Sequence, residues 1–374
     1  MRAVVVYPGK NRSPELTDVA EPSPAPGQLR VKVLRVGVCG TDREILAGGH
    51  GAPPPGQERL VLGHESFGQV EDVAGHADGW SPGDYVVATV RRGCGACAHC
   101  AANMSDFCTT GGFVERGILG MDGFLAERYV EEPRYLVRVP PELREVGVLL
   151  EPLSVVEKAA QQALASQVRV PGKPTASLEP WQAGPPGWQP ERVLVLGAGP
   201  IGILGALVLK LAGAGEVLAV ERTERPAKRD LLATAGIGYK ATGGGPLRDV
   251  LAGEQFDLIL EATGSSQSVV DALPLLAANS VCCLTGVFPG SAGERSVPLD
   301  ELLREMLYRN KSIVTTVNSN RSYFERGVQS MVEIERRWPG LLARLITRRM
   351  PMERYAEAVE PERDGVKTVV EVGR

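Results

Sequence analysis

The sequence predicts a two-domain α/β protein, in which a mainly antiparallel β domain shaped as a partly open barrel precedes a doubly wound nucleotide-binding domain. Three observations lead to this fold class. A chain of 374 residues is long for one domain. Its first part alternates apolar and polar residues with the period of half-buried strands, and its second part alternates short apolar runs with helical stretches.

The strands of the first domain are predicted from this alternation. Leu29–Val36 has apolar residues at every second position. The pattern recurs in Ser66–Val73 and in Asp84–Val90, with Ser81–Asp84 as the turn between them. Residues 1 to about 165 are therefore expected to be mainly antiparallel β structure.

The second domain is predicted from short apolar runs, which are expected of parallel strands buried on both faces. Pro200–Ala212 and Gln267–Ala278 have helical spacing and separate some of these runs. With a short strand near Tyr239, the count reaches the six strands of a doubly wound dinucleotide-binding sheet. The other five are Val193–Leu196, Val217–Val220, Leu258–Leu260, Ser280–Leu284 and Ile313–Val317.

The predicted domain limits follow from the change of pattern. The first domain covers residues 1–188, the nucleotide-binding domain covers 189–318, and residues 319–374 return to the first domain. Residues 166–190 are rich in proline and glycine and have no apolar period, so they are expected to form a linker or surface excursion without an assigned role.

A glycine-rich motif between a predicted strand and a predicted helix marks a candidate cofactor site. Its first glycine permits a tight turn, its second lets the backbone approach a pyrophosphate, and its third lets helix and strand pack closely. The phosphates then lie at the positive end of the helix. Glycine turns also join ordinary strands to helices, but an acidic residue at the end of the next strand favours cofactor binding. The predicted cofactor residues are Gly197, Gly199, Pro200, Ile201 and Gly202, with Glu221 and Arg222.

The sequence leaves the choice of nicotinamide nucleotide open. Glu221 can accept hydrogen bonds from the adenosine ribose and repels a 2′-phosphate, which favours NAD. Arg222 and Arg225 can instead clamp that phosphate, or they are simply solvated. NAD is therefore expected, with NADP as the alternative.

Four cysteines within fifteen residues predict a structural zinc site. Crowded cysteines without a secretion signal favour metal over disulfides. Four thiolates close a tetrahedral shell and leave no open position, so this metal is expected to brace a lobe. The ligands are Cys94, Cys97, Cys100 and Cys108.

A second set of metal-ligand types is dispersed along the chain. Cys39 follows a strand, His64 begins the next ordered segment, and Glu151 follows a hydrophobic run. One cysteine, one histidine and one carboxylate leave a zinc position open to water or substrate, as in catalytic zinc sites. Each residue also has an ordinary explanation, as a core cysteine, an interior histidine or a helix-start charge. Spacing alone does not decide between these interpretations.

Composition excludes other classes of protein. A net charge of −4 argues against a nucleic-acid surface, and no apolar run approaches the roughly 18 residues that a membrane span needs. The first residues read as a strand and not as a signal peptide, so a cytoplasmic location is expected.

The order of these motifs resembles the zinc-containing medium-chain dehydrogenases over nearly the whole chain. That family combines a GroES-like, partly open β-barrel catalytic domain with a six-stranded Rossmann domain. Finer details resemble one branch, the glucose (aldose) dehydrogenases of archaea and some bacteria. They are Cys39-Gly-Thr-Asp-Arg-Glu-Ile, Leu62-Gly-His-Glu, Glu115-Arg-Gly-Ile, Glu151-Pro-Leu-Ser-Val-Val-Glu-Lys158, and Asn310-Lys311 through Val317-Asn318-Ser319.

The resemblance implies a role for each dispersed motif. Cys39, His64 and Glu151 are the implied ligands of a catalytic zinc. Glu65 coordinates at some stage of the cycle or holds a zinc-bound water, and which carboxylate binds directly stays open because relatives differ. Thr41 matches the hydroxyl that hands off the substrate proton.

The substrate side is implied by the same resemblance. Glu115 and Asn318 match positions that contact sugar hydroxyls or the nicotinamide end of the cofactor. Glu44 stands where many alcohol dehydrogenases have a relay histidine, which leaves the far end of the proton path open. Thr89 and Val155 stand where some sugar-oxidising relatives place polar contacts, which leaves strict glucose preference open.

The implied activity is a zinc-dependent aldose 1-dehydrogenase with two zinc ions per chain, which oxidises an aldopyranose at C1 to the lactone with NAD or NADP. The active site is expected between the two domains. A polyol, threonine or simple alcohol dehydrogenase is the alternative enzyme, and a silent nucleotide-binding relative is the alternative of another class. By analogy, the late strands of the sheet pair subunits in a homodimer or homotetramer.

Overall fold

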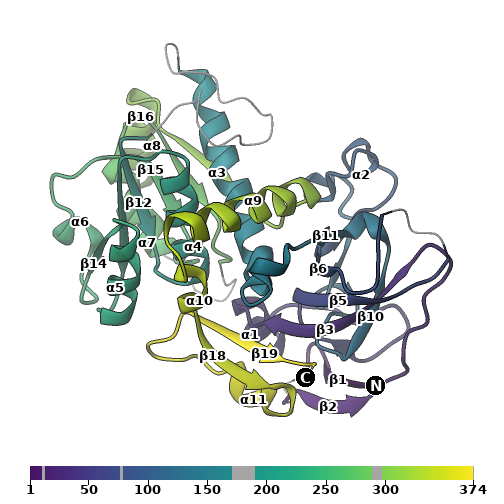
Figure 1. Ribbon diagram of the computed structural model, residues 1–374. Coiled ribbons are helices and arrows are strands. Elements are labelled where there is room, and N and C mark those ends of the chain that lie inside the picture. The colour runs from purple at the N-terminus through teal and green to yellow at the C-terminus, as the bar shows by residue number, and fades with distance from the viewer. Residues whose placement is uncertain (11–12, 76–78, 171–189, 289–296, 374) are drawn as a thin grey trace. The chain divides into compact units, whose positions relative to one another are not determined.

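The computed structural model describes residues 1–10, 13–75, 79–170, 190–288 and 297–373, and this part of the chain forms two compact units (Figure 1). The first unit comprises Met1–Glu151, Asn318–Val332 and Leu342–Arg374, and the second comprises Pro152–Val317 and Glu333–Leu341. Residues 152–170 thus group with the second unit, whereas the sequence pattern assigns them to the first. Most of the predicted excursion at 166–190 lies outside the described residues.

The first unit is built on a mixed sheet in the order β11-β6-β5-β3-β19-β18, with β10 also paired to β3 (Figure 1). Two three-stranded sheets, β2-β1-β4 and β7-β8-β9, complete it. Its strands are β1 (Arg2–Val6), β2 (Glu15–Asp18), β3 (Leu29–Gly37), β4 (Leu60–Val61), β5 (Glu65–Val73), β6 (Tyr85–Ala88), β7 (Arg91–Arg92), β8 (Val114–Arg116), β9 (Gly120–Met121), β10 (Arg128–Glu131), β11 (Leu136–Arg138), β18 (Ile346–Pro351) and β19 (Lys367–Glu371).

Strand β3 shows how the alternating pattern produces this sheet. Leu29, Val31 and Val33 are fully buried, and the residues between them are partly exposed. Antiparallel pairing of β3 with β5 places Gly37 opposite Glu65. A Cβ atom at Gly37 would lie 1.9 Å from the Oε2 atom of Glu65. Glycine at this position therefore leaves room for the buried carboxylate of Glu65 at the start of β5.

A buried group of charges joins the short strands of the first unit to β10. The Nη2 atom of Arg116 lies 2.9 Å from the Oε2 atom of Glu131, and Arg92 contacts the same oxygen. Burial works to raise the pKa of Glu131, but the charges of Arg92 and Arg116 outweigh it and lower that pKa.

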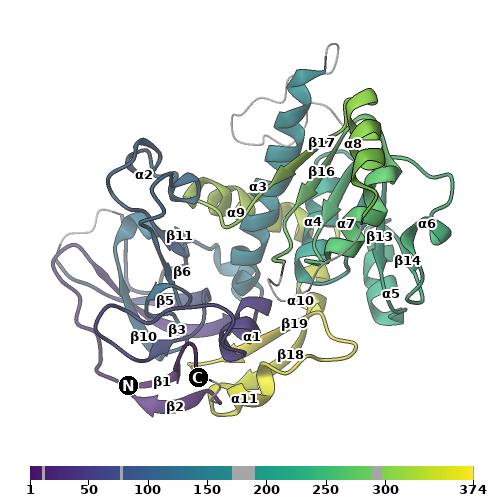
Figure 2. The ribbon, with the colours of Figure 1, turned by 180° about the vertical axis from the view of Figure 1, so that it is seen from behind.

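The second unit contains a parallel sheet in the order β14-β13-β12-β15-β16-β17, with β17 at one edge (Figure 2). This is the strand order of a doubly wound dinucleotide-binding fold. Each of the six predicted strands is found, and Val193–Leu196 of β12 is buried on both faces. The strands are β12 (Arg192–Leu196), β13 (Glu216–Glu221), β14 (Gly238–Ala241), β15 (Phe256–Glu261), β16 (Leu276–Leu284) and β17 (Ser312–Thr315).

One predicted helix is shorter than expected. Helical spacing predicts a helix over Gln267–Ala278, but α7 covers Ser266–Ala272, and β16 begins at Leu276. Pro274 explains the difference, because proline has no N–H for the helical ladder and clashes with the preceding turn. The helix predicted at Pro200–Ala212 is confirmed as α4 (Pro200–Leu211), followed by Gly213 with φ of +88°.

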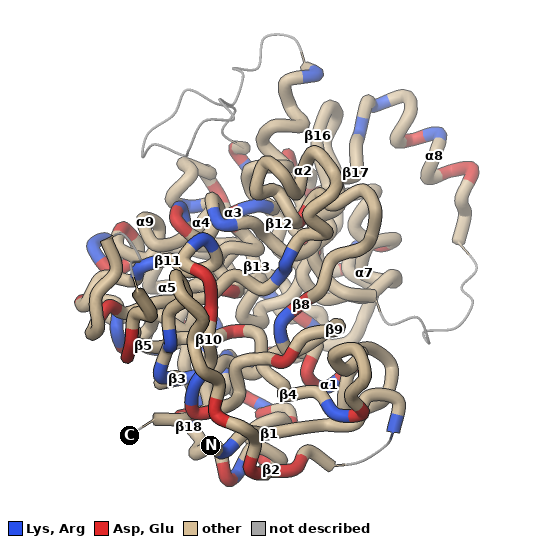
Figure 3. The backbone as a smooth tube through the Cα atoms, turned by 90° about the vertical axis from the view of Figure 1, so that its right-hand side faces the viewer, with Lys and Arg blue, Asp and Glu red and all other residues tan. Residues whose placement is uncertain are grey.

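The remaining α-helices are short or are shared between the two units. They are α1 (Gly40–Leu46), α2 (Ala98–Ala101), α3 (Leu150–Ala165), α5 (Pro226–Thr234), α6 (Leu247–Val250), α8 (Leu299–Tyr308), α9 (Arg321–Arg337), α10 (Leu341–Leu345) and α11 (Tyr355–Ala358). Among the described residues, no helix combines the length and apolar character that a bilayer crossing requires. Positive and negative residues are interleaved along the backbone (Figure 3).

Candidate active site and metal centres

Three of the predicted zinc ligands come together in the first unit. The Sγ atom of Cys39, one ring nitrogen of His64 and one carboxylate oxygen of Glu65 all lie within 4.8 Å of one another. His64 and Glu65 are almost fully buried. The hydroxyl of Thr41 lies 4.0 Å from the sulfur of Cys39. A thiolate, an imidazole and a carboxylate that converge in a buried place match the donor set of a zinc site with an open position.

Asp42 contacts both Cys39 and His64, a role that the sequence motif did not reveal. It is the third residue of α1, and its Oδ2 atom accepts a hydrogen bond of 2.8 Å from the backbone N–H of Cys39. Its Oδ1 atom lies 3.7 Å from the Nδ1 atom of His64. At this distance the carboxylate acts on the imidazole electrostatically and without a hydrogen bond. Burial works to lower the pKa of His64, but interactions led by the charge of Asp42 outweigh it and raise that pKa.

Lys367 is the second partner that the sequence did not reveal. Its ammonium group contacts the carboxylate of Glu65 and donates a hydrogen bond of 3.0 Å to the carbonyl of Val38. Both charged side chains are almost completely buried. The pair therefore stabilises a charged Glu65 in a place where an isolated carboxylate would be very costly.

Glu151, at the second position of α3, does not join the group of three within 4.8 Å. It lies near enough to interact electrostatically with it. Burial, followed by the negative charge of Glu65, raises the pKa of Glu151 to about 7. Which of the two carboxylates binds a metal directly stays a prediction. The geometry favours Glu65, because it lies with Cys39 and His64 in the group of three.

The two predicted substrate residues contact each other although 203 residues separate them in the chain. The Nδ2 atom of Asn318 donates to the Oε1 atom of Glu115 over 2.8 Å. Arg91 donates to the same oxygen from Nε at 3.0 Å, and its Nη2 lies 2.9 Å away. The guanidinium of Arg91 lies 3.8 Å from the ring centre of Phe113. All the described contacts to this carboxylate therefore fall on one oxygen.

The four cysteines predicted to bind a structural zinc lie close together in the segment around α2. The sulfur atoms of Cys94, Cys97, Cys100 and Cys108 lie within 4.8 Å of one another. The sulfur of Cys94 accepts hydrogen bonds of 3.4 Å from the N–H groups of Ala96 and Cys97. A hydrogen bond from Thr110, followed by one from Ala96, lowers the pKa of Cys94 to about 7. Burial raises the pKa of Cys100 to about 12, so the closed set of four sulfurs, and not a shared thiolate character, is what fits a structural zinc.

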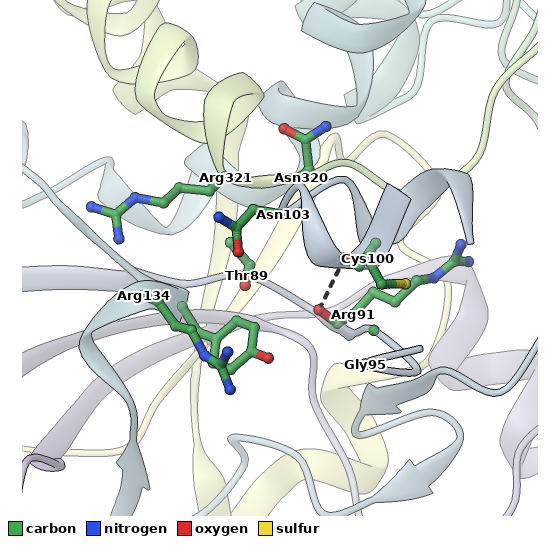
Figure 4. A pocket seen from close by; sticks show the side chains of 11 residues that line it. Thr89, Arg91, Gly95, Cys100, Asn103, Arg134, Asn320 and Arg321 are labelled. Carbon is green, nitrogen blue, oxygen red and sulfur yellow. Dashed lines mark hydrogen bonds between the residues drawn. The ribbon is translucent and has the colours of Figure 1, made fainter. Parts of the chain in front are cut away.

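A polar pocket of about 120 Å³ lies beside this lobe (Figure 4). Thr89, Asn103 and Asn320 line it, and Arg134 lies at its edge with its guanidinium 4.8 Å from the ring centre of Tyr135. Thr89 is the only predicted sugar-side position among its described lining residues; Glu115, Asn318 and the metal-ligand residues are not among them.

The glycine motif has a separate physical requirement for each glycine. Gly197 has φ of +96°, which favours glycine. A Cβ at Gly199 would meet nothing within 4 Å, so the backbone there faces open space that a pyrophosphate can fill. A Cβ at Gly202 would lie 1.8 Å from the carbonyl oxygen of Gly197. Pro200 and Ile201 begin α4, as the predicted anion-binding helix requires.

The acidic residue predicted to hold the ribose is already engaged by protein groups. The Oε1 atom of Glu221 accepts a hydrogen bond of 2.6 Å from the hydroxyl of Tyr239. Its Oε2 atom accepts one of 2.9 Å from the ammonium group of Lys228. Arg222 is exposed and has no carboxylate partner among the described residues. Neither Lys228 nor Tyr239 was predicted, because each lies several residues from the motif.

Comparisons with known proteins identify the family. Residues 25–141 match the model of the alcohol dehydrogenase GroES-like domain, and residues 144–372 match that of the glucose dehydrogenase C-terminus. The glucose 1-dehydrogenase of Methanocella arvoryzae is 40% identical over 376 residues, which is 100% of both chains. That of Thermoproteus tenax is 39% identical and covers 100% of this chain and 99% of its own.

The solved structures agree with the sequence comparisons. A structure of Haloferax mediterranei glucose dehydrogenase in complex with NADP, Zn and gluconolactone is 33% identical, with a TM-score of 0.86 over 100% of each chain. The predicted fold, a GroES-like domain with a Rossmann domain, is thereby confirmed. The chain belongs to the glucose dehydrogenase branch of the zinc-containing medium-chain dehydrogenases.

Proposed function

We propose that this chain is a zinc-dependent aldose 1-dehydrogenase that oxidises D-glucose or a related aldopyranose at C1 to the lactone and transfers hydride to NAD or NADP. The observation that carries the chemistry is the convergence of Cys39, His64 and Glu65 in a buried place beside Thr41. The glucose 1-dehydrogenase relatives, and the related enzyme solved with NADP, Zn and gluconolactone, support the substrate and the cofactors.

The residues of the site can supply the zinc ligands and the proton acceptor that this reaction needs. Cys39 and His64 would hold a catalytic zinc together with Glu65 or Glu151, and the four-cysteine cluster would hold a second zinc. The catalytic zinc, when bound, supplies a Lewis acid that lowers the pKa of the sugar's C1 hydroxyl. The hydroxyl of Thr41, which lies 4.0 Å from the sulfur of Cys39, would take up the proton that the sugar hydroxyl releases and pass on its own.

Glu115 and Asn318 are proposed to position the sugar. Arg91 and Asn318 both donate to the Oε1 atom of Glu115, so the second oxygen is the acceptor available to a sugar hydroxyl. A site that hydrogen-bonds a hydroxyl rejects analogues that lack it far more strongly than an apolar pocket does. Simple alcohols are therefore expected to be poor substrates.

We also propose that the enzyme is a cytoplasmic homodimer or homotetramer. Strand β17 is an edge strand of the parallel sheet, and Leu303, Leu307 and Tyr308 of α8 are exposed. An unpaired edge and exposed large apolar side chains are features that subunit contacts cover. None of the seven cysteines, all of which lie in the described part of the chain, forms a disulfide, which suits a reducing compartment.

The test is initial-rate oxidation of D-glucose, D-galactose, D-xylose, sorbitol, L-threonine and ethanol, each with NAD and with NADP. Each rate is measured before chelation, after chelation and after restoration of zinc. Aldose turnover that is lost on chelation and restored by zinc is expected, with sorbitol and ethanol inert. Turnover confined to an acyclic alcohol would move the protein to another branch of the family. Failure to turn over any of these compounds with zinc bound would refute the proposed substrate class.

A further inference from the structure

Glu221 at the carboxyl end of β13 lies in a small, closed network of protein groups. Tyr239, on the neighbouring strand β14, donates to one carboxylate oxygen over 2.6 Å, and Lys228 of α5 donates to the other over 2.9 Å. The side chains of Lys228 and Glu221 are only 10% and 14% exposed. The ammonium group therefore offsets the negative charge of Glu221 in a poorly hydrated place, where the interaction is much stronger than in water.

Tyr239 also fixes the turn between β13 and α5. Its hydroxyl accepts a hydrogen bond of 2.9 Å from the backbone N–H of Arg225 while it donates to Glu221. Burial, followed by the hydrogen bond to Glu221, raises the pKa of Tyr239 well above its ordinary value, so the hydroxyl keeps the proton that it donates. The carboxylate is thus held between two donors and does not need to turn outward to be satisfied.

The charges around this turn differ from those of a site built for NAD alone. A free carboxylate at the end of this strand would repel the 2′-phosphate of NADP, which carries nearly two negative charges. Here that carboxylate is paired, whereas Arg222 at the next position is exposed and has no carboxylate partner among the described residues. The balance of charge beside the predicted ribose position is therefore positive.

We propose that Lys228, by neutralising the charge of Glu221, is a specificity-determining residue that lets this chain accept NADP as well as NAD. Arg222 is then the group that meets the 2′-phosphate. Each carboxylate oxygen of Glu221 accepts one hydrogen bond, from Lys228 or from Tyr239, and retains a second lone pair for the ribose hydroxyls of NAD. This inference rests on the proposed function only for the identity of the cofactor, and it concerns binding and not turnover.

The experiment measures the dissociation constants of NAD and NADP by isothermal titration calorimetry on the zinc-loaded protein without sugar. The variants are Lys228→Met, Glu221→Gln and the double variant. Methionine keeps an unbranched apolar stem like that of lysine, and it removes the charge and the hydrogen bond that the ammonium group donates to Glu221. The matched control is Lys240→Met, which removes an exposed lysine of β14 that is paired with Glu254.

Lys228→Met is expected to raise the dissociation constant for NADP by about tenfold or more and that for NAD by less than about threefold. The double variant is expected to recover NADP binding, because glutamine removes the charge that lysine had offset. Lys240→Met is expected to leave the ratio unchanged. Equal weakening of both nucleotides, or a double variant that does not recover, would assign Lys228 a structural role and overturn the proposal.

The outcome is separable from that of the proposed function. A shifted NADP to NAD ratio in a protein that oxidises no aldose would support this inference and refute the proposed substrate. Glucose oxidation with a ratio that Lys228→Met does not change would support the activity and refute this inference.

Discussion

Replacing Arg91 by methionine would test how the proposed sugar-binding carboxylate is held. Arg91 makes contacts of 2.9 and 3.0 Å with a single oxygen of Glu115, and the two side chains are 7% and 10% exposed. Methionine keeps an unbranched apolar side chain but removes the charge and the contact of the guanidinium with Phe113. Asn318 then remains as the described hydrogen-bond donor to the Glu115 carboxylate.

The magnitude follows from the burial of this pair. Removing one partner of a buried ion pair costs about 3–5 kcal/mol, because the other charge is left uncompensated. The hydrogen bond from Asn318 offsets part of that cost, so we expect the free energy of unfolding to fall by about 2–4 kcal/mol. At about 2–4 °C per kcal/mol for a domain of this size, the unfolding midpoint should fall by about 4–16 °C.

Urea unfolding followed by circular dichroism measures the stability, and steady-state kinetics measures the sugar site. We expect KM for the aldose to rise by about tenfold or more with a smaller change in kcat, because a displaced Glu115 weakens sugar binding. The control is Arg134→Met, an arginine that is 60% exposed and paired with Glu132, with an expected cost below about 1 kcal/mol. The double variant with Glu115→Gln should recover stability. If Arg91→Met cost no more than the control, the reasoning would be refuted.

Three further predictions concern other parts of the molecule. Gly202→Ala places a Cβ 1.8 Å from the carbonyl oxygen of Gly197 and should weaken NADPH binding by about tenfold or more in a fluorescence titration; unchanged affinity would mean that the turn can relax. Cys97→Ser should reduce the zinc content from two to one per chain by mass spectrometry and lower the melting temperature; retention of both ions would contradict the four-sulfur site. The lowered pKa of Glu131 means that its stabilising contribution is present above its unfolded pKa of about 4.3 and is lost as the pH falls toward the folded value. Glu131→Gln should therefore destabilise the protein at pH 7 and flatten the acid limb of a stability–pH curve, and a limb as steep as in the unsubstituted protein would argue against this contribution.

The fold could be predicted from the sequence because its signals are local. The alternation in Leu29–Val36 and the apolar run Val193–Leu196 each report how one strand is buried, without reference to distant residues. The motif from Gly197 to Gly202 was predictable for the same reason, since its steric requirements lie within six residues. The prediction of a helix over Gln267–Ala278 was wrong beyond Ala272. It followed the helical spacing of the apolar residues and gave no weight to Pro274, which is also a local signal.

The residues of the candidate site could be predicted only where they belong to contiguous sequence motifs. Cys39 and His64 stand in such motifs, and the structure brings them together with Glu65. Lys367 contacts Glu65 from 302 residues further along the chain, and no periodicity or spacing connects the two.

Glu221 shows the further limit of a motif. The sequence correctly located an acidic residue at the end of the strand, and its usual meaning is a preference for NAD. That interpretation assumes that no nearby positive charge offsets the carboxylate, so that it can repel the 2′-phosphate of NADP. In this structure Lys228 offsets the charge of Glu221, and Tyr239 bonds the other carboxylate oxygen. Both contacts depend on how α5 and β14 pack beside β13. A motif can therefore place an acidic residue at the end of this strand, whereas the surrounding packing decides whether the charge of that residue is free or offset.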